Sequence, residues 1–418
     1  MRPVTAPARW RCVTSMPTTC RRFRRRGCRS SGWRSSCRRV RSGSIRSNVI
    51  GRSVADELRC NGGCPGEADC PGPASPMTGG FGRFVVGTGR CGSTLCSRML
   101  AEHPDVVSLN ECFTGLDWGR RFSTDPVSGA EVAAILSTPN QVTHDALSRG
   151  YTAEEITYPF RATDRYRRSD PVPWLLVSTL PYLSDDPDAL FDRTLEWLRL
   201  RPVAPIAEHY SALFDRLAAG AGGGMWVERS GSSVDYLADL DEHFSEARFV
   251  HLHRDGPEVA LSMRRHALYR LAVQLVYGVV PDGVDPDDDS EEGRDRLVRA
   301  WLEGQPPIEL YGRYWSDQMV RGCEAAASLP EERLLTVAFV DLVERPVEVM
   351  GDLAGFFEFP PSPRFAEQAA MLVDGVPPAR YGDLSDQERA ALDAACEPGR
   401  AALAALQGRG HISPRTNP

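Results

Sequence analysis

The chain has 418 residues, a formal net charge of −7 and 42% hydrophobic residues, values that are ordinary for a soluble globular protein. This length allows two domains or one large α/β domain with insertions. No run of about 18 apolar residues occurs, so we predict no membrane-spanning helix.

Charge is unevenly distributed along the chain. Residues 1–76 hold 16 arginines and four acidic residues, whereas residues 77–418 carry a net charge of −19. Because the first segment lacks hydrophobic periodicity, we expect it to be disordered. Three interpretations compete for it: a nucleic-acid-binding arm, a targeting segment, and an over-extended start that precedes Met77. We favour the third, because the segment has no apolar signal-peptide core and the acidic remainder argues against a nucleic-acid partner.

The 12 cysteines predict no zinc site. Seven lie in residues 1–76 without the paired spacing of a four-ligand set, and five are scattered through the rest. Scattered thiols are typical of a reducing compartment, so we expect a cytoplasmic protein without a metal site.

The most informative stretch begins with Phe84-Val85-Val86, which predicts a short buried strand. Glycines then allow sharp turns that direct backbone N–H groups inward, and a helix follows whose dipole favours negative charge. We call this segment the glycine loop and expect it to bind an anion. Its spacing is that of a nucleotide-binding P-loop, except that serine replaces the lysine. Its members are Gly87, Thr88, Gly89, Arg90, Cys91, Gly92, Ser93 and Thr94.

Further elements follow in chain order. A helix is expected over about 92–102 and ends at His103, and a strand over 106–109 leads to Glu111. Residues 112–185 are irregular and aromatic-rich, and we interpret them as an insertion that covers the site and supplies substrate contacts. Plain surface structure is the alternative.

The rest of the chain alternates strands with helices. Strands are expected over 225–228, 248–253 and 334–339, a solvated acidic loop over 281–295, and a turn over 340–342. Helices are expected over 187–200, 205–218, 305–327 and 346–357, with two more in 363–406. This alternation predicts, over 77–418, a P-loop-like three-layer α/β domain with a central parallel sheet of about five strands flanked by helices.

Four strand ends carry the candidate chemistry. The glycine loop, Glu111, Arg229 and Arg254 each follow a predicted strand, and ligands of such sheets bind at the carboxyl ends of the strands. Taken alone, each of these features could have an ordinary structural role instead, such as a surface ion pair for Arg254 or a helix cap for Glu111. Their shared placement at one sheet edge favours a site.

Two motifs resemble those of the sulfotransferases that use 3′-phosphoadenosine 5′-phosphosulfate (PAPS). Residues 85–95 are similar to that family's 5′-phosphosulfate loop. Residues 250–256, with Ser262 eight positions after Arg254, are similar to its 3′-phosphate motif. The resemblance covers roughly 77–360 and implies that the glycine loop, Arg254 and Ser262 bind PAPS. Many members have lysine where Arg90 stands; arginine is found in a branch that includes tyrosylprotein and several bacterial carbohydrate sulfotransferases.

The resemblance also implies a mechanism. In that branch a glutamate just after the second strand is the general base, which assigns this role to Glu111. Arg90 and, by a looser match, Arg229 would stabilise the developing charge. The implied reaction is an in-line transfer of a sulfuryl group from PAPS to a hydroxyl of a carbohydrate, a lipid or another small molecule, with no metal.

Two rival functions remain open at this point. A P-loop kinase or nucleotidase would use the strand over 334–339 and Asp341 as its metal-binding element, but Ser93 in place of lysine argues against it. A nucleic-acid-binding protein depends on residues 1–76 alone. The sequence predicts neither the acceptor nor the oligomeric state.

Overall fold

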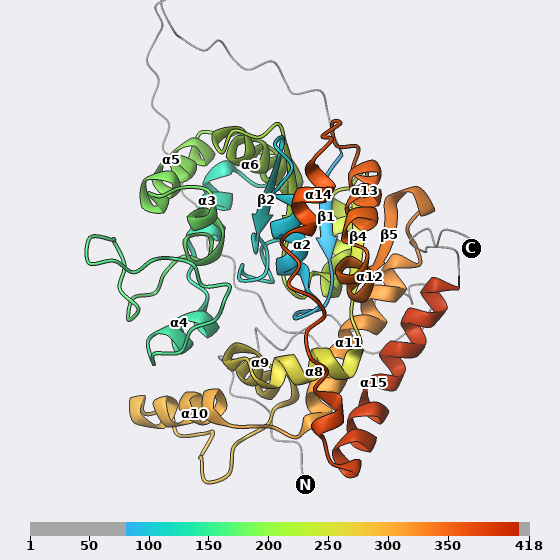
Figure 1. Ribbon diagram of the computed structural model, residues 1–418. Helices are drawn as coiled ribbons and strands as arrows, with labels where there is room; N and C mark the ends of the chain where they lie inside the picture. The colour runs from blue at the N-terminus through green and yellow to red at the C-terminus, as the bar shows by residue number, and fades with distance from the viewer. Residues whose placement is uncertain (1–80, 409–418) are drawn as a thin grey trace, which may run out of the picture. The chain divides into compact units, whose positions relative to one another are not determined.

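The structure is a computed structural model, and it describes residues 81–408. The predicted arginine-rich segment 1–76 and the start at Met77 lie outside the described residues. Within the described part, five parallel strands form one sheet in the order β2-β3-β1-β4-β5 (Figure 1). The predicted parallel sheet is therefore confirmed. The strands are β1 (Arg83–Val86), β2 (Val106–Asn110), β3 (Met225–Arg229), β4 (Arg248–His253) and β5 (Leu334–Ala338).

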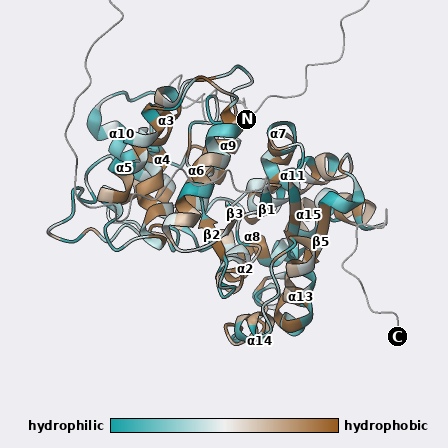
Figure 2. Cartoon of the chain, turned by 90° about the horizontal axis from the view of Figure 1, so that it is seen from above, coloured by the Kyte–Doolittle hydropathy of each residue, from teal (hydrophilic) through white to brown (hydrophobic). Residues whose placement is uncertain are grey.

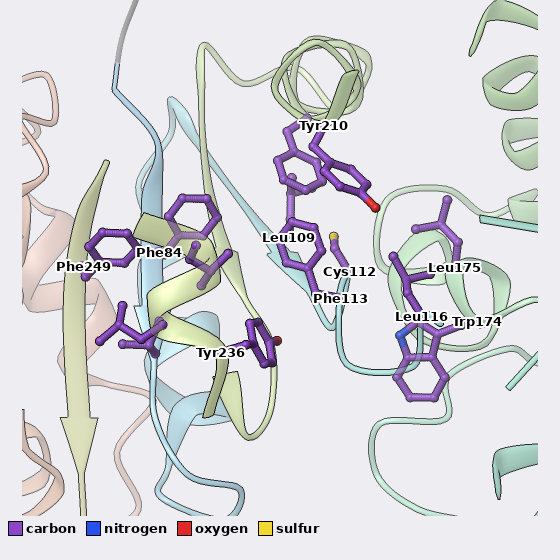
Figure 3. Packing of buried hydrophobic residues seen from close by; sticks show 14 of the residues in the cluster. Phe84, Leu109, Cys112, Phe113, Leu116, Trp174, Leu175, Tyr210, Tyr236 and Phe249 are labelled. Carbon is purple, nitrogen blue, oxygen red and sulfur yellow. The ribbon is translucent and has the colours of Figure 1, made fainter. Parts of the chain in front are cut away.

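Both faces of the sheet are buried. In β1, Phe84 and Val86 join one hydrophobic cluster and Val85 joins another; in β4, Phe249 and Val250 divide in the same way. Figure 3 shows Phe84 and Phe249 side by side in the first cluster. Successive side chains of a strand point to opposite faces, so a strand of consecutive apolar residues needs a helical layer on each side. The predicted three-layer architecture follows from this pattern.

Amphipathic helices form the two outer layers. They are α2 (Ser93–Leu100), α6 (Ile206–Gly220), α7 (Leu237–His243), α8 (Gly256–Arg264), α11 (Ile308–Ala326), α13 (Pro346–Phe356), α14 (Phe365–Ala370) and α15 (Asp386–Gln407). The first cluster takes side chains from α6, α7, α8, α11 and α15, and the second from α2, α13 and α14. In Figure 2 hydrophobic and hydrophilic residues alternate along these helices, as amphipathic packing against a sheet requires.

Residues 112–185 contain more regular structure than their composition indicates. Helix α3 (Gly129–Ser137) starts at a capping box between Ser128 and Glu131, and Asn140 caps α4 (Gln141–Leu147). The prediction of an irregular stretch is wrong at these two helices, because local capping outweighs the proline and threonine content.

The same stretch contributes to the main core. Leu116, Trp174 and Leu175 are buried in the first hydrophobic cluster (Figure 3). Leu175–Thr179 forms a π-helical turn, and α3 packs against α5 (Pro187–Arg199). Much of this predicted insertion is therefore anchored by apolar burial.

Two other boundaries differ from expectation, and one further helix was not predicted. Helix α10 (Glu291–Glu303) starts inside the stretch expected to be an acidic loop, because the Ser290 side chain caps its first turn. The turn expected at 340–342 lies within the short helix α12 (Phe339–Glu344). Helix α9 (Ala267–Tyr277) follows α8, and α9 and α10, together with Ala146 of α4, form a third hydrophobic cluster.

Candidate active site

The loops that follow the strands meet at one edge of the sheet. All five described strands are parallel, so their carboxyl ends lie at the same edge. The strand register pairs Arg229 of β3 with Val85 of β1 on one side and with Asn110 of β2 on the other. The glycine loop and Glu111 therefore flank Arg229.

Close packing makes glycine necessary at two positions of the glycine loop. A Cβ atom at Gly87 would lie 2.5 Å from the Leu252 carbonyl oxygen, and one at Gly92 would lie 2.1 Å from the Phe339 ring. Gly92 also has a φ of 98°, which residues with a side chain rarely adopt. Helix α2 starts directly after Gly92 without a side-chain cap, so its first N–H groups are available to an anion.

The side chains of the loop also fit an anion site. Thr88 is only 1% exposed, and its Oγ1 has no hydrogen-bond partner among the described residues. A buried hydroxyl without a partner is costly, and an anionic ligand would satisfy it. Burial raises the pKa of Cys91, which keeps this residue a neutral thiol. Tyr269 closes over the loop, since a Cβ atom at Gly89 would lie 1.6 Å from its hydroxyl oxygen.

Arg90 links the two sequence motifs. Its Nε donates a hydrogen bond to Ser262 Oγ at 3.2 Å, and its Nη1 lies 3.3 Å from carboxylate oxygens of both Glu154 and Glu155. Its φ of 63° lies in the left-handed region, which is unfavourable for a residue with a long side chain. Ser262 thus contacts Arg90, a contact that the sequence motif did not predict.

Arg254 is a half-buried cation at the end of β4. No carboxylate of residues 81–408 forms an ion pair with it, so the surface ion pair considered for it is absent there. Burial lowers the pKa of its guanidinium, which lies 4.7 Å from the centre of the Phe339 ring. Because Phe339 also packs on Gly92, one aromatic side chain connects the two predicted anion sites. Phe339 was not predicted from the sequence; its position directly after β5 was the available signal.

Glu111 and Arg229 form a buried ion pair through Arg229 Nη1 and Glu111 Oε1. The second Glu111 oxygen, Oε2, accepts hydrogen bonds from Thr114 Oγ1 at 2.7 Å and from the Gly231 N–H at 2.9 Å. Arg229 Nη2 donates to Asn110 Oδ1 at 2.7 Å. Glu111 has a φ of 56° at the end of β2 and caps none of the described helices. Both carboxylate oxygens are therefore held in fixed directions.

Glu228 is a second buried carboxyl beside this pair and was missed from the sequence. Burial, and then the charge of Glu111, raises the pKa of Glu228 to about 8, although its hydrogen bond with Ser230 lowers it. Its Oε1 accepts hydrogen bonds from the Cys112 N–H at 3.2 Å and from Ser230 Oγ at 2.5 Å. The neutral acid thus holds together the loops that follow β2 and β3. The available signal was an acidic residue directly after the apolar residues Met225, Trp226 and Val227 of β3.

Other predicted features have structural explanations. His103 follows α2, and its Nε2 bonds to the Pro360 carbonyl oxygen at 2.9 Å, which confirms it as a helix-end residue. Asp341 lies in α12 and pairs with Arg345 at 3.0 Å, which weakens the alternative of a kinase metal-binding element.

Across residues 81–408, no group of three or more His, Cys, Asp or Glu side chains is arranged to hold a metal ion. No helix in the described range is sufficiently long and apolar to cross a bilayer.

Comparison with known proteins gives a family assignment. No curated protein matches the chain. Solved structures with a similar arrangement include the sulfotransferase domain from the curacin biosynthetic pathway, at 14% identity and a TM-score of 0.42 over 78% of this chain and 98% of that one. The sulfotransferase domain from the Synechococcus PCC 7002 olefin synthase has 17% identity and a TM-score of 0.39 over 80% and 95%. Sulfotransferase STF9 from Mycobacterium avium has 16% identity and a TM-score of 0.38 over 81% and 78%.

The family assignment rests on the amino-acid sequence. Residues 84–363, which are more than half of the chain, match the sequence profile of the sulfotransferase family. This range contains the glycine loop, the strand ends that carry Glu111, Arg229 and Arg254, and helix α12 directly after β5. The chain belongs to the sulfotransferase family.

Proposed function

We propose that the protein transfers a sulfuryl group from PAPS to an acceptor hydroxyl of a carbohydrate, a lipid or another small molecule. The observation that supports the proposal is a pair of groups suited to bind anions at one sheet edge. One is the glycine loop with the uncapped start of α2, and the other is Arg254 at the start of α8. PAPS carries a 5′-phosphosulfate and a separate 3′-phosphate, so a protein that binds it needs two such sites.

The roles of the residues follow from their surroundings. The N–H groups of the glycine loop and the Thr88 hydroxyl bind the 5′-phosphosulfate, and Arg254 binds the 3′-phosphate. Ser262 contributes by holding Arg90 Nε. Arg90 stabilises negative charge as it develops on the transferred group and its leaving oxygen.

Glu111 is the proposed general base. Arg229 holds one oxygen of its carboxylate, and Thr114 and Gly231 hold the other, so the carboxylate is oriented before the acceptor arrives. Accepting a proton requires one of the bonds to Oε2 to be exchanged for a bond to the acceptor hydroxyl. Transfer then proceeds by in-line attack of the acceptor oxygen on sulfur, with adenosine 3′,5′-bisphosphate as the leaving group.

Calorimetric titration of the full chain with adenosine 3′,5′-bisphosphate tests the donor site. We expect binding without magnesium, and Arg254→Ala is expected to weaken it by about 10-fold to 100-fold, the loss typical of a charged hydrogen bond. Arg193→Ala, at an exposed position of α5, is the control and should bind like the unmodified protein. Magnesium-dependent binding of ADP without binding of the bisphosphate would instead favour the kinase or nucleotidase function.

We also propose a cytoplasmic location. The support is that the described cysteines, Cys91, Cys96, Cys112, Cys323 and Cys396, are all buried free thiols. A fractionation experiment that found the protein outside the cytoplasm would contradict this location without affecting the proposed reaction.

A further inference from the structure

A carboxylate from residues 112–185 reaches the arginine of the glycine loop. Glu155 Oε1 lies 3.3 Å from Arg90 Nη1, although the two residues are 65 positions apart in the sequence. Its other oxygen, Oε2, lies 3.2 Å from His266 Nε2, at the junction between α8 and α9. Glu155 therefore bridges the loop after β1 and the segment after β4.

Glu155 is itself held in place. Its carbonyl oxygen accepts a hydrogen bond from Ser178 Oγ at 2.6 Å, within the π-helical turn. Its side chain is 20% exposed, compared with 73% for the neighbouring Glu154, which touches the same Arg90 atom. Burial raises the pKa of Glu155, but the hydrogen bond and charge of His266 and the charge of Arg90 outweigh this and bring it to about 2. Glu155 is thus a permanently charged and well-ordered partner, whereas Glu154 is a solvated one.

The remaining contacts of Arg90 define what its guanidinium can offer to a ligand. Nε is occupied by Ser262 and Nη1 by the two glutamates. Nη2 makes no hydrogen bond to any residue in the described range, and it is accessible to solvent. Because a guanidinium is planar and rigid, fixing Nε and Nη1 also fixes the direction of the Nη2 N–H groups.

We propose that Glu155 is a positioning residue that orients Arg90 so that its free Nη2 edge faces the transferred sulfuryl group. This inference rests on the proposed function. It gives residues 112–185 a role at the donor side of the reaction, in addition to their contribution to the core. It also explains why a carboxylate is tolerated beside the proposed anion site: the Arg90 guanidinium balances its charge, and His266 Nε2 lies 3.2 Å from its other oxygen.

The test compares the affinities of the full chain for two nucleotides, PAPS and adenosine 3′,5′-bisphosphate, by calorimetry. At pH 8 both carry about two negative charges at the 5′ position, since the second pKa of a phosphate monoester is about 6. Removing the Glu155 charge should therefore change the affinity for both nucleotides by the same factor through long-range electrostatics. Only PAPS has the sulfuryl group that Arg90 is proposed to contact, so the ratio of the two dissociation constants reports the position of Arg90.

We expect Glu155→Gln to weaken the binding of PAPS relative to that of the bisphosphate, so that the ratio of the PAPS dissociation constant to the bisphosphate dissociation constant rises by about tenfold. This is the contribution typical of one oriented charged hydrogen bond. Glu155→Asp keeps the charge but withdraws the carboxylate, so it should change the ratio in the same direction. Glu154→Gln removes a charge equally close to Arg90 and should change the ratio by less than about twofold, as is typical of exposed pairs. Because Glu155 is proposed to act through Arg90, the double variant Arg90→Ala/Glu155→Gln should have the same ratio of dissociation constants as Arg90→Ala alone.

Each outcome separates the two proposals. A Glu155→Gln variant that binds the bisphosphate normally and keeps the unmodified ratio would overturn the positioning role and leave the proposed function standing. Equal weakening of both nucleotides would show a merely structural role for Glu155. If the unmodified protein binds neither nucleotide, the proposed function and this inference both fail.

Discussion

The buried pair of Glu111 and Arg229 allows a quantitative prediction that needs no acceptor. Their side chains are 5% and 3% exposed, so removing one partner leaves the other charge in a site almost without water. Arg229→Met preserves much of the side-chain volume and removes only the guanidinium. The Glu111 carboxylate then retains two hydrogen bonds, from Thr114 and from the Gly231 N–H. We expect the free energy of unfolding to fall by about 3–5 kcal/mol, the cost typical of a broken buried pair.

The assay is urea unfolding followed by circular dichroism at neutral pH. The control is Arg165→Met, which removes a pair with Asp192 whose side chains are 39% and 50% exposed and a longer contact of 3.9 Å with Asp188. Exposed pairs contribute about 0–1 kcal/mol, so this variant should stay close to the unmodified protein. The double variant Glu111→Gln/Arg229→Met removes both charges, and it should be more stable than the sum of the single losses predicts, by about 2 kcal/mol.

Two results would refute this reasoning. A loss of less than about 1 kcal/mol for Arg229→Met would mean that the pair behaves like an exposed one. Additive losses in the double variant would mean that the two side chains do not interact in solution. Raising the salt concentration should affect the control pair more than the buried pair, because ions screen exposed charges.

Three further predictions concern stability. Gly92→Ala should destabilise the fold strongly in thermal unfolding, because its Cβ would lie 2.1 Å from the Phe339 ring, whereas Gly351→Ala, with open space around it, should be neutral or stabilising by about 0.4–1 kcal/mol. Folding raises the pKa of Glu228 from its ordinary value of 4.5 to about 8, so the stability that this carboxyl contributes is fully present below pH 4.5 and is lost as the pH rises toward 8. In urea titrations over that pH range, the stability of Glu228→Gln relative to the unmodified protein should therefore increase. His251 is fully buried, and neither ring nitrogen has a hydrogen-bond partner among residues 81–408; burial, with a smaller effect of His253, lowers its pKa to about 3. His251→Leu should gain stability over the unmodified protein as the pH falls from 6.5 toward 3.

Clear outcomes would contradict these three predictions. Equal melting temperatures for the Gly92 and Gly351 variants would show that the glycine loop can move away from Phe339. A pH-independent difference for Glu228→Gln would mean that this carboxyl titrates normally in the folded state. If His251→Leu lost its advantage in acid, His251 would have a partner that accepts its proton.

The proposed donor site could be predicted from the sequence because its residues are local in sequence. The glycine loop is a single run of eight residues whose turns, hydroxyls and helix start can be recognised without tertiary information. Arg254 was found for a similar reason, since a strand, an arginine and a helix cap follow one another directly. The parallel sheet was predictable from consecutive apolar residues in short strands.

Contacts between distant segments were not predictable in this way. Glu155 reaches Arg90 only because the π-helical turn places its backbone there, and nothing in its local sequence distinguishes it from Glu154. Phe339 packs on Gly92 because β5 lies two strands away from β1, a relation set by the strand order. The helices α3 and α4 were missed for a different reason. Helix α4 is short and polar and offers little hydrophobic periodicity, whereas the mostly apolar α3 and its capping box were local signals that we overlooked.

Three residues in the loops after the strands have strained backbone conformations. Arg90, Glu111 and Ser232 adopt left-handed φ angles of 63°, 56° and 56°, and they lie in the loops after β1, β2 and β3 respectively. Each such residue costs about 1–3 kcal/mol and persists only where the surroundings determine its conformation. Here the loops restrain one another, since the Glu111 N–H donates to the Arg229 carbonyl oxygen at 2.7 Å and the Gly87 N–H donates to Ser233 Oγ at 3.3 Å. The apolar layers on both sheet faces offset this cost, so the polar groups of the site are held in place before any ligand binds.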